Sequence, residues 1–166
     1  CGCGRADRVS AGGGCPVRVG TTVTVCELQS LSGHIGGAWA VAYRPDGGEL
    51  ASAGADGTIR IWDTDTGKEL QSLSGHIGGA WAVAYRPDGA ELAVAGADGT
   101  VRIWDTDTGQ ELHSLSGHVG VVCEAVAYRS DGAELAVAGA DGTVRIWDTD
   151  TGQELHSLSG QTPGVS

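Results

Sequence analysis

The chain has 166 residues, of which 10 are lysine or arginine and 21 are aspartate or glutamate, and its formal net charge at pH 7 is −11. An acidic chain of this kind argues against nucleic acids and anionic membrane surfaces as partners. The sequence shows no run of about 18 apolar residues and no signal peptide, so we expect neither a membrane-spanning helix nor export. The single lysine and the excess of Gly and Ala favour a bacterial origin, and we expect a cytoplasmic protein.

A unit of 42 residues dominates the sequence. Residues 33–74 recur as residues 75–116 and, with one extra residue, as residues 117–159. The first two copies differ at five positions, among them Ser52, which is Val94 in the second copy. A repeat of about 40–45 residues indicates one supersecondary unit that stacks on copies of itself.

Within the first unit, apolar runs and turn signals predict four short strands joined by tight turns. Residues 58–63 alternate between apolar and polar side chains, as a half-buried strand does. Asp56-Gly57, directly before them, is a strong signal for a two-residue hairpin. One such sheet cannot bury both of its faces alone, so the units must pack face to face. We expect strands at residues 38–43, 49–53, 58–63 and 69–73, with turns at residues 45–47, 56–57 and 64–67.

Two dipeptides recur at fixed places in every unit. The first unit opens with Gly33-His34, and its third strand closes with Trp62-Asp63. With these motifs and this period, the chain resembles the WD40 repeat family, whose units form the four-stranded blades of a β-propeller. The resemblance implies an all-β fold with three complete blades, at residues 33–74, 75–116 and 117–159. The motifs of the other two units are Gly75-His76 with Trp104-Asp105 and Gly117-His118 with Trp147-Asp148.

Residues 8–32 align with the repeat without a gap, and we expect them to form a partial, degenerate blade. This segment has Gly20 where the first unit has Trp62. We expect residues 1–7 to be disordered and residues 160–166 to form a C-terminal tail.

Three complete units are too few for a closed ring, because propellers of this kind usually have about 4–8 blades. We therefore expect either a fragment of a longer protein or a ring completed by self-association, for example as a homodimer. The near identity of the units favours pairing between chains.

The WD40 resemblance also implies a hydrogen-bonded set inside each blade, formed by a His, a Ser or Thr, an Asp and a Trp. A buried carboxylate needs donors, and imidazole, hydroxyl and indole groups provide them. The second and third units have Val94 and Val137 in place of the Ser, so we expect the link from His to Trp to be broken or bridged by water there. A hydrolase triad is the alternative hypothesis, but the set recurs in each unit without a catalytic context. The implied structural sets are His34, Ser52, Asp56 and Trp62; His76, Asp98 and Trp104; and His118, Asp141 and Trp147.

Trp39 and Trp81 stand just inside the first predicted strand of their units. In the propellers that the chain resembles, this position lies on the top rim near the central channel and often touches a ligand. The third unit has Cys123 and Glu124 here after one extra residue, an insertion that suits a β-bulge. The sequence leaves open whether the two Trp side chains are exposed anchors or pack between blades. The predicted partner-binding set is Trp39, Trp81, Cys123 and Glu124.

No metal or cofactor site is predicted. Pairs of Asp in the turn after each third strand resemble the start of a calcium loop, but Thr66-Gly67 ends the pattern too early. Four cysteines near the N-terminus do not have the spacing of a zinc site. The Asp pairs are Asp63/Asp65, Asp105/Asp107 and Asp148/Asp150, and the cysteines are Cys1, Cys3, Cys15 and Cys26.

By its resemblance to WD40 proteins, the chain is expected to be a non-catalytic scaffold that binds a protein or a peptide at the top rim. The alternative hypothesis is a regulatory or accessory segment of a larger bacterial signalling enzyme, such as a kinase or an NTPase. An independent enzyme is the weakest hypothesis, because the sequence shows no activated nucleophile, phosphate-binding loop or metal set. The sequence does not identify the partner.

Overall fold

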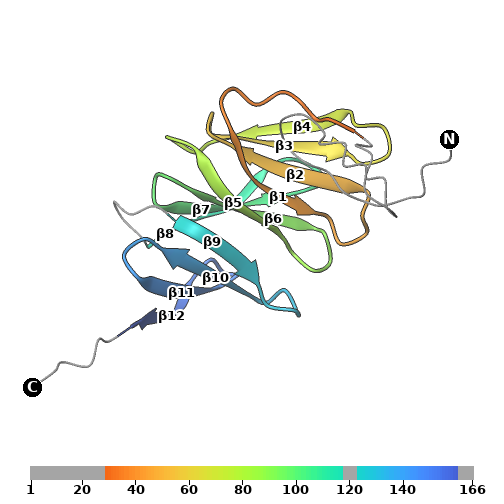
Figure 1. Ribbon diagram of the computed structural model, residues 1–166. Coiled ribbons are helices and arrows are strands. Elements are labelled where there is room, and N and C mark those ends of the chain that lie inside the picture. Colours follow the sequence, from red (N-terminus) through yellow and green to blue (C-terminus); the bar gives the residue numbers. More distant parts are fainter. Residues whose placement is uncertain (1–28, 118–122, 161–166) are drawn as a thin grey trace, which may run out of the picture.

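The computed structural model describes residues 29–117 and 123–160 (Figure 1). In this part of the chain all regular structure is β, with twelve strands in three four-stranded antiparallel sheets. Neighbours in each sheet follow one another along the chain, so each sheet is a meander. Blade one consists of β1 (Ala38–Tyr43), β2 (Glu49–Gly54), β3 (Thr58–Asp63) and β4 (Glu69–Ser74). Blade two consists of β5 (Ala80–Tyr85), β6 (Glu91–Gly96), β7 (Thr100–Asp105) and β8 (Glu111–Ser116). Blade three consists of β9 (Cys123–Tyr128), β10 (Glu134–Gly139), β11 (Thr143–Asp148) and β12 (Glu154–Ser159).

The predicted all-β fold is confirmed, and the predicted strands of the first unit agree with β1 to β4 to within one residue at each end. The tight turns explain this agreement. The predicted two-residue hairpin at Asp56-Gly57 is wrong in length: Ala53 pairs with Ile59, so the loop holds the three residues Ala55 to Gly57. Gly57 has a φ of 76°, in the left-handed region that favours glycine, and its N–H donates to the Gly54 carbonyl at 3.1 Å. The described residues contain no helix that is long and apolar enough to span a membrane.

Apolar side chains fill the space between successive blades. Side chains along a strand alternate between the two faces of its sheet. We call the face toward the preceding blade proximal and the face toward the following blade distal. The distal face of blade one packs on the proximal face of blade two through Ala51, Ala53, Ile59, Ile61 and Leu73 from blade one and Ala80, Tyr85, Leu92, Val94 and Trp104 from blade two. Blades two and three are joined in the same way through Ala93, Ala95, Val101, Ile103 and Leu115 from blade two and Cys123, Leu135, Val137 and Trp147 from blade three.

The first strand of each blade contacts the first strand of the next, so that β1 lies against β5 and β5 against β9 (Figure 1). The fourth strands β4, β8 and β12 are at the opposite edges of their sheets. Loops that precede β1 and β5 therefore emerge at the same end of neighbouring blades, which brings equivalent residues of the two units close together.

Candidate functional site

In blade one the structure joins four side chains from different segments by hydrogen bonds. Trp62 Nε1 donates to Ser52 Oγ at 2.9 Å, and Ser52 Oγ lies 2.7 Å from His34 Nε2. His34 Nδ1 lies 3.2 Å from Asp56 Oδ1. Since a carboxylate only accepts, this network assigns the proton of the imidazole to Nδ1, and the Ser52 hydroxyl donates to Nε2. The Ser52 hydroxyl is thus fixed between two rings and buried, which suits a structural link and not a nucleophile.

Asp56 also ties the loop before β1 to the turn before β3. Its Oδ2 accepts the Ile35 N–H at 2.9 Å, and its Oδ1 accepts the Thr58 N–H at 3.0 Å and the Thr58 hydroxyl at 2.7 Å. Burial opposes the charged form, but the hydrogen bonds from Ile35, Thr58 and His34 outweigh it and hold the pKa of Asp56 well below its usual range. The carboxylate is therefore ionised at neutral pH and fixes the position of Ile35.

In blade two Val94 interrupts this network. His76 Nδ1 still lies 3.2 Å from Asp98 Oδ1, and Asp98 Oδ2 accepts the Ile77 N–H at 3.2 Å. However, His76 Nε2 and Trp104 Nε1 are buried and have no hydrogen-bond partner among the described residues. The direct link from His to Trp is absent here because a Val side chain has no polar atom to form it.

Replacing Val94 by Ser is expected to stabilise the chain by about 1 kcal/mol. The loss of apolar packing costs about 1–1.5 kcal/mol. In return, the new hydroxyl can form hydrogen bonds with His76 Nε2 and Trp104 Nε1, and each of these buried groups costs about 1–3 kcal/mol when it has no partner. The reverse change, Ser52→Val, should destabilise blade one. Urea denaturation measures both effects, provided that the dependence of the unfolding free energy on urea concentration is the same in all variants. A Val94→Ser chain less stable than the wild type would contradict this account.

Stability is also expected to fall as the pH drops below about 6.5. Burial lowers the pKa of His76, an effect that Asp98 opposes only in part. The unfolded chain therefore takes up more protons than the folded chain as the pH falls through the ordinary pKa of histidine, which favours unfolding.

Thermal melts between about pH 7.5 and about pH 5.5 test this dependence, because unpaired carboxylates titrate below that window. His76→Gln should reduce the pH dependence. Equal pH dependence in His76→Gln and the wild type would rule out His76 as its source.

In blade three the structure describes two members of the implied set. Asp141 Oδ1 accepts the Thr143 N–H at 2.9 Å and the Thr143 hydroxyl at 2.7 Å, as Asp56 does with Thr58. Trp147 is buried and packs with Val137 between blades two and three. His118 lies outside the described residues.

Trp39 and Trp81 combine the two alternatives that the sequence leaves open. Their ring centroids are 4.8 Å apart with an interplanar angle of 58°, so the rings touch across the boundary between blades. Trp39 also lies over Gly79 of blade two, with Cζ3 2.9 Å from the position that a Cβ would take there. Nevertheless, Trp39 remains 48% exposed and Trp81 40% exposed.

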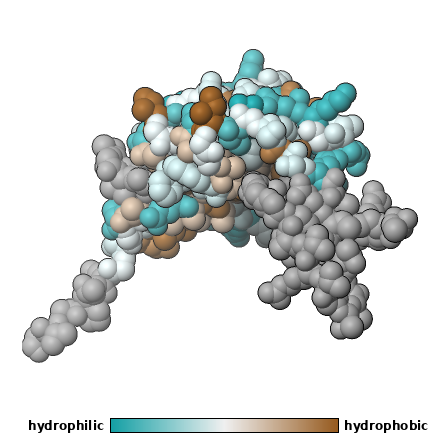
Figure 2. Space-filling model, turned by 45° about the horizontal axis from the view of Figure 1, so that its top comes forward, coloured by the Kyte–Doolittle hydropathy of each residue, from teal (hydrophilic) through white to brown (hydrophobic). Residues whose placement is uncertain are grey.

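Two further apolar side chains, which the sequence analysis did not single out, are exposed in the same region. Ile35 and Ile77, in the loops before β1 and β5, are each 80% exposed. Apolar side chains project from the surface in the space-filling view (Figure 2). We call the surface formed by Ile35, Trp39, Ile77 and Trp81 the Ile–Trp rim. The repeated His-Ile dipeptide at the start of two units was the available sequence signal.

The structure separates Cys123 from the predicted partner-binding set. Cys123 is buried between blades two and three, and burial raises the pKa of its thiol to about 11. It pairs with Gly139 as Ala80 pairs with Gly96, so Glu124 is the residue equivalent to Trp81. Glu124 is exposed.

The interpretation of the extra residue in the third unit as the source of a β-bulge is also corrected. All three first strands have a register irregularity, and Trp39, Trp81 and Glu124 are the residues skipped by the pairing. Blades one and two have this irregularity without the extra residue. The bulge is therefore a property of every described blade.

The Asp pairs that resemble a calcium loop serve their own turns. Asp63 Oδ1 accepts the N–H groups of Asp65 and Thr66, both at 2.8 Å, and these bonds lower the pKa of Asp63. Asp105 and Asp148 make the same contacts in their blades. Among the described residues there is no group of three or more His, Cys, Asp or Glu that could hold a metal ion. Cys1, Cys3, Cys15 and Cys26 lie outside this part of the chain.

The family model described as "WD domain, G-beta repeat" matches residues 25–63, 67–105 and 109–148. Each match ends at the Asp that closes a third strand, where the Trp-Asp dipeptide lies. No match is found among curated proteins. The three matched segments together span most of the sequence and eleven of the twelve described strands, all except β12, and the chain belongs to the WD40 repeat family.

Proposed function

We propose that this chain is a non-catalytic scaffold that binds a protein or peptide segment through the Ile–Trp rim. WD40 repeats are generally protein-interaction scaffolds, which supports the class of function. The observation that carries the proposal is the exposure of four large apolar side chains, Ile35, Trp39, Ile77 and Trp81, at matching positions of two consecutive blades. Exposed apolar groups that gather in one place are typical of interaction sites.

The rim is well suited to binding because its backbone is already held in place. Asp56 accepts the N–H of Ile35, and Asp98 accepts the N–H of Ile77, so each loop is fixed before a partner arrives. A fixed loop loses little conformational entropy on binding. Trp39 and Trp81 add a large apolar surface in which the two rings contact each other. Trp is also over-represented among the interface residues that contribute most of the binding energy.

Selection of a displayed library of random peptides against the chain tests the proposal. Peptides that bind the wild type should lose about tenfold or more in affinity for the double variant Ile35→Ser, Ile77→Ser, because each Ile contributes about 1.5–3 kcal/mol when buried. Trp39→Ala should weaken binding in the same way.

The matched control is Leu70→Ser with Leu112→Ser, which removes two exposed apolar side chains from the fourth strands β4 and β8. Peptide affinity should stay unchanged in this variant. Peptides that bind the rim variants and the wild type equally, or that depend on Leu70 and Leu112 instead, would place the binding surface elsewhere.

A further inference from the structure

The distal face of blade three has the sequence of a covered face, but it is open. Residues 125–159 repeat residues 82–116 with one substitution, so blade three presents the same distal side chains as blade two. Leu115 on the distal face of blade two is 3% exposed, whereas Leu158 at the same position of blade three is 55% exposed. The difference arises because no blade of the described residues follows blade three.

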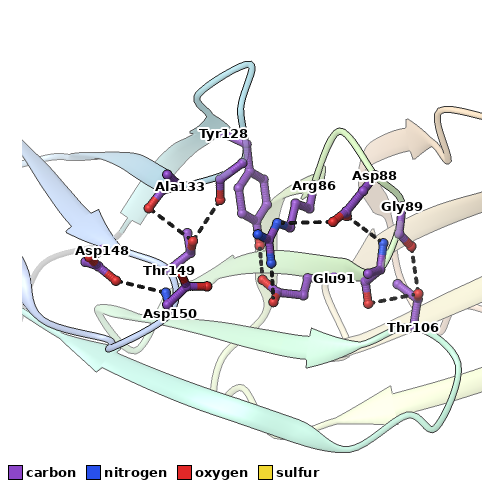
Figure 3. Close-up of polar contacts among 12 residues, drawn as sticks. Arg86, Asp88, Gly89, Glu91, Thr106, Tyr128, Ala133, Asp148, Thr149 and Asp150 are labelled. Carbon is purple, nitrogen blue, oxygen red and sulfur yellow. Dashed lines mark hydrogen bonds and ion pairs between the residues drawn. The ribbon is translucent and has the colours of Figure 1, made fainter.

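Each covered distal face packs against a tyrosine of the next blade, and Figure 3 shows the contact that Tyr128 makes. The Tyr128 hydroxyl donates to Glu91 Oε2 of blade two at 3.5 Å, while Arg86 Nη1 donates to Glu91 Oε1 at 2.8 Å. Burial and the charge of Glu91 raise the pKa of Tyr128, which keeps its hydroxyl protonated as a donor. Tyr85 is likewise buried near Glu49 of blade one, and burial and that carboxylate raise its pKa as well, but the Tyr85 hydroxyl and Glu49 Oε2 have no hydrogen-bond partner among the described residues.

The arginine of each covered blade also lies over the first turn of the next blade. Arg44 Nε lies 2.9 Å from the position that a Cβ would take at Gly89, and Arg86 Nε lies 2.6 Å from that position at Gly132. The side chains of Arg44 and Arg86 are 22% and 20% exposed. Arg129, their equivalent in blade three, is 57% exposed although it pairs with Glu134 at 3.0 Å.

Blade one presents the matching residues on its proximal side. Tyr43 is 44% exposed, against 9% for Tyr85. At Gly47, in the first turn of blade one, no heavy atom of the described residues lies within 4 Å of the position of a Cβ. The contact that joins blades inside the chain therefore has two halves that face outward. One half is Tyr43 and Gly47 in blade one, and the other is Arg129 and Glu134 in blade three.

We propose that the chain associates with a second copy of itself, with the distal face of blade three of one copy covering the first strand of blade one of the next. Tyr43 of the second copy then donates to Glu134, and Arg129 lies over Gly47. The same residue types make both parts of this contact between blades two and three, and the arginine lies over the glycine between blades one and two as well. A head-to-tail contact of this kind closes into a ring where its rotation allows and otherwise continues from copy to copy.

The proposed contact involves the inner strands and not the outer edge of blade one. At that edge, Gln29 Oε1 and Leu31 Cδ2 of the same chain lie 3.1 Å and 3.5 Å from the position that a Cβ would take at Gly67. Gln29 also donates to the Asp65 carbonyl at 3.0 Å. Leu158 of a docked copy would meet this occupied edge, so its substitution is a control for nonspecific apolar association.

Sedimentation of the whole chain over a wide range of concentration tests the proposal. The wild type should sediment as assemblies heavier than the 16.7 kDa of one copy. Tyr43→Ala and Arg129→Ala should each weaken association by about tenfold, since both remove a central contact. Tyr43 and the Arg129 side chain are each about half exposed in one copy, so each variant should keep the circular dichroism of the wild type. Lys68→Gln, which copies the second and third units, should change nothing.

Mixing the two weakened variants gives the sharpest result. The Tyr43→Ala copy keeps an intact distal face and the Arg129→Ala copy an intact proximal face, so the mixture should recover association that neither variant shows alone. Failure to recover would indicate a symmetric contact and overturn the proposal. A monomeric wild type at every concentration would overturn it too, as would association that Leu158→Glu abolishes while Tyr43→Ala and Arg129→Ala leave it intact.

Discussion

Replacing Asp56 by Ala is expected to destabilise the chain by about 3–5 kcal/mol, because four hydrogen bonds converge on this carboxylate and each bond to a charged group contributes about 1.5–3 kcal/mol. The donors are the Ile35 N–H, the Thr58 N–H, the Thr58 hydroxyl and His34 Nδ1. The total is less than the sum of four bonds because the side chain is partly accessible and water replaces some of them. His34 and the two N–H groups would then be left near an apolar methyl group.

Urea denaturation measures the global effect, and amide hydrogen exchange locates it. The Ile35 and Thr58 amides should exchange faster in Asp56→Ala by more than the change in global stability predicts, since both lose their acceptor. Asp65→Ala, at an exposed position of the same blade, should change stability by no more than about 0.5 kcal/mol. Equal effects of the two substitutions would show that Asp56 does not hold blade one together.

The strands could be predicted from the sequence because tight turns fix their ends. The register itself differs from the predicted one, because the loop holds the three residues Ala55 to Gly57 and Ser52 pairs with Arg60, whereas a two-residue loop at Asp56-Gly57 would pair Ser52 with Ile61. The hydrogen-bonded set was accessible only through the family resemblance, since its members are far apart in sequence. The effect of Val94 then followed from chemistry alone, because an alkyl side chain cannot link an imidazole to an indole.

The environments of Trp81 and Cys123 could not be predicted, because the bulge breaks the alternation on which such predictions rest. Ala82 packs in the cluster between blades two and three, and strict alternation would place Ala80 on the same face. Instead Ala80 packs between blades one and two. Cys123 occupies the position in blade three that Ala80 occupies in blade two. It is therefore buried against blade two, while its neighbour Glu124 is exposed.

The exposure of Ile35 could not be predicted for a different reason. It lies in a loop, where there is no periodicity to indicate a face. Its position depends on the hydrogen bond from its N–H to Asp56, a residue 21 positions later in the chain. A long-range contact of this kind becomes visible only when the turn and the loop are placed together by the packing of the blade.

Replacing Gly57 by Ala is expected to destabilise the chain by about 3 kcal/mol or more. The left-handed conformation of this residue, with a φ of 76°, costs any other residue about 1–2 kcal/mol. In addition, a Cβ at this position would lie 2.5 Å from the carbonyl oxygen of His76. Because that atom belongs to the backbone of blade two, the contact can be relieved only by moving two blades apart, and overpacking of this kind costs about 1–3 kcal/mol more.

Gly142→Ala is the matched control, since it separates the two contributions. Gly142 occupies the same position in the turn of blade three, with a φ of 78°, and no heavy atom of the described residues lies within 4 Å of where its Cβ would be. This variant should lose only about 1–2 kcal/mol, the cost of the backbone conformation. The difference between the two variants in urea denaturation then measures how tightly the turn of blade one packs on the loop that carries His76 and Ile77. Equal losses of stability in the two variants would mean that blades one and two can move apart at this point at no cost in free energy. The packing of one blade on the next would then not hold the loops of the Ile–Trp rim.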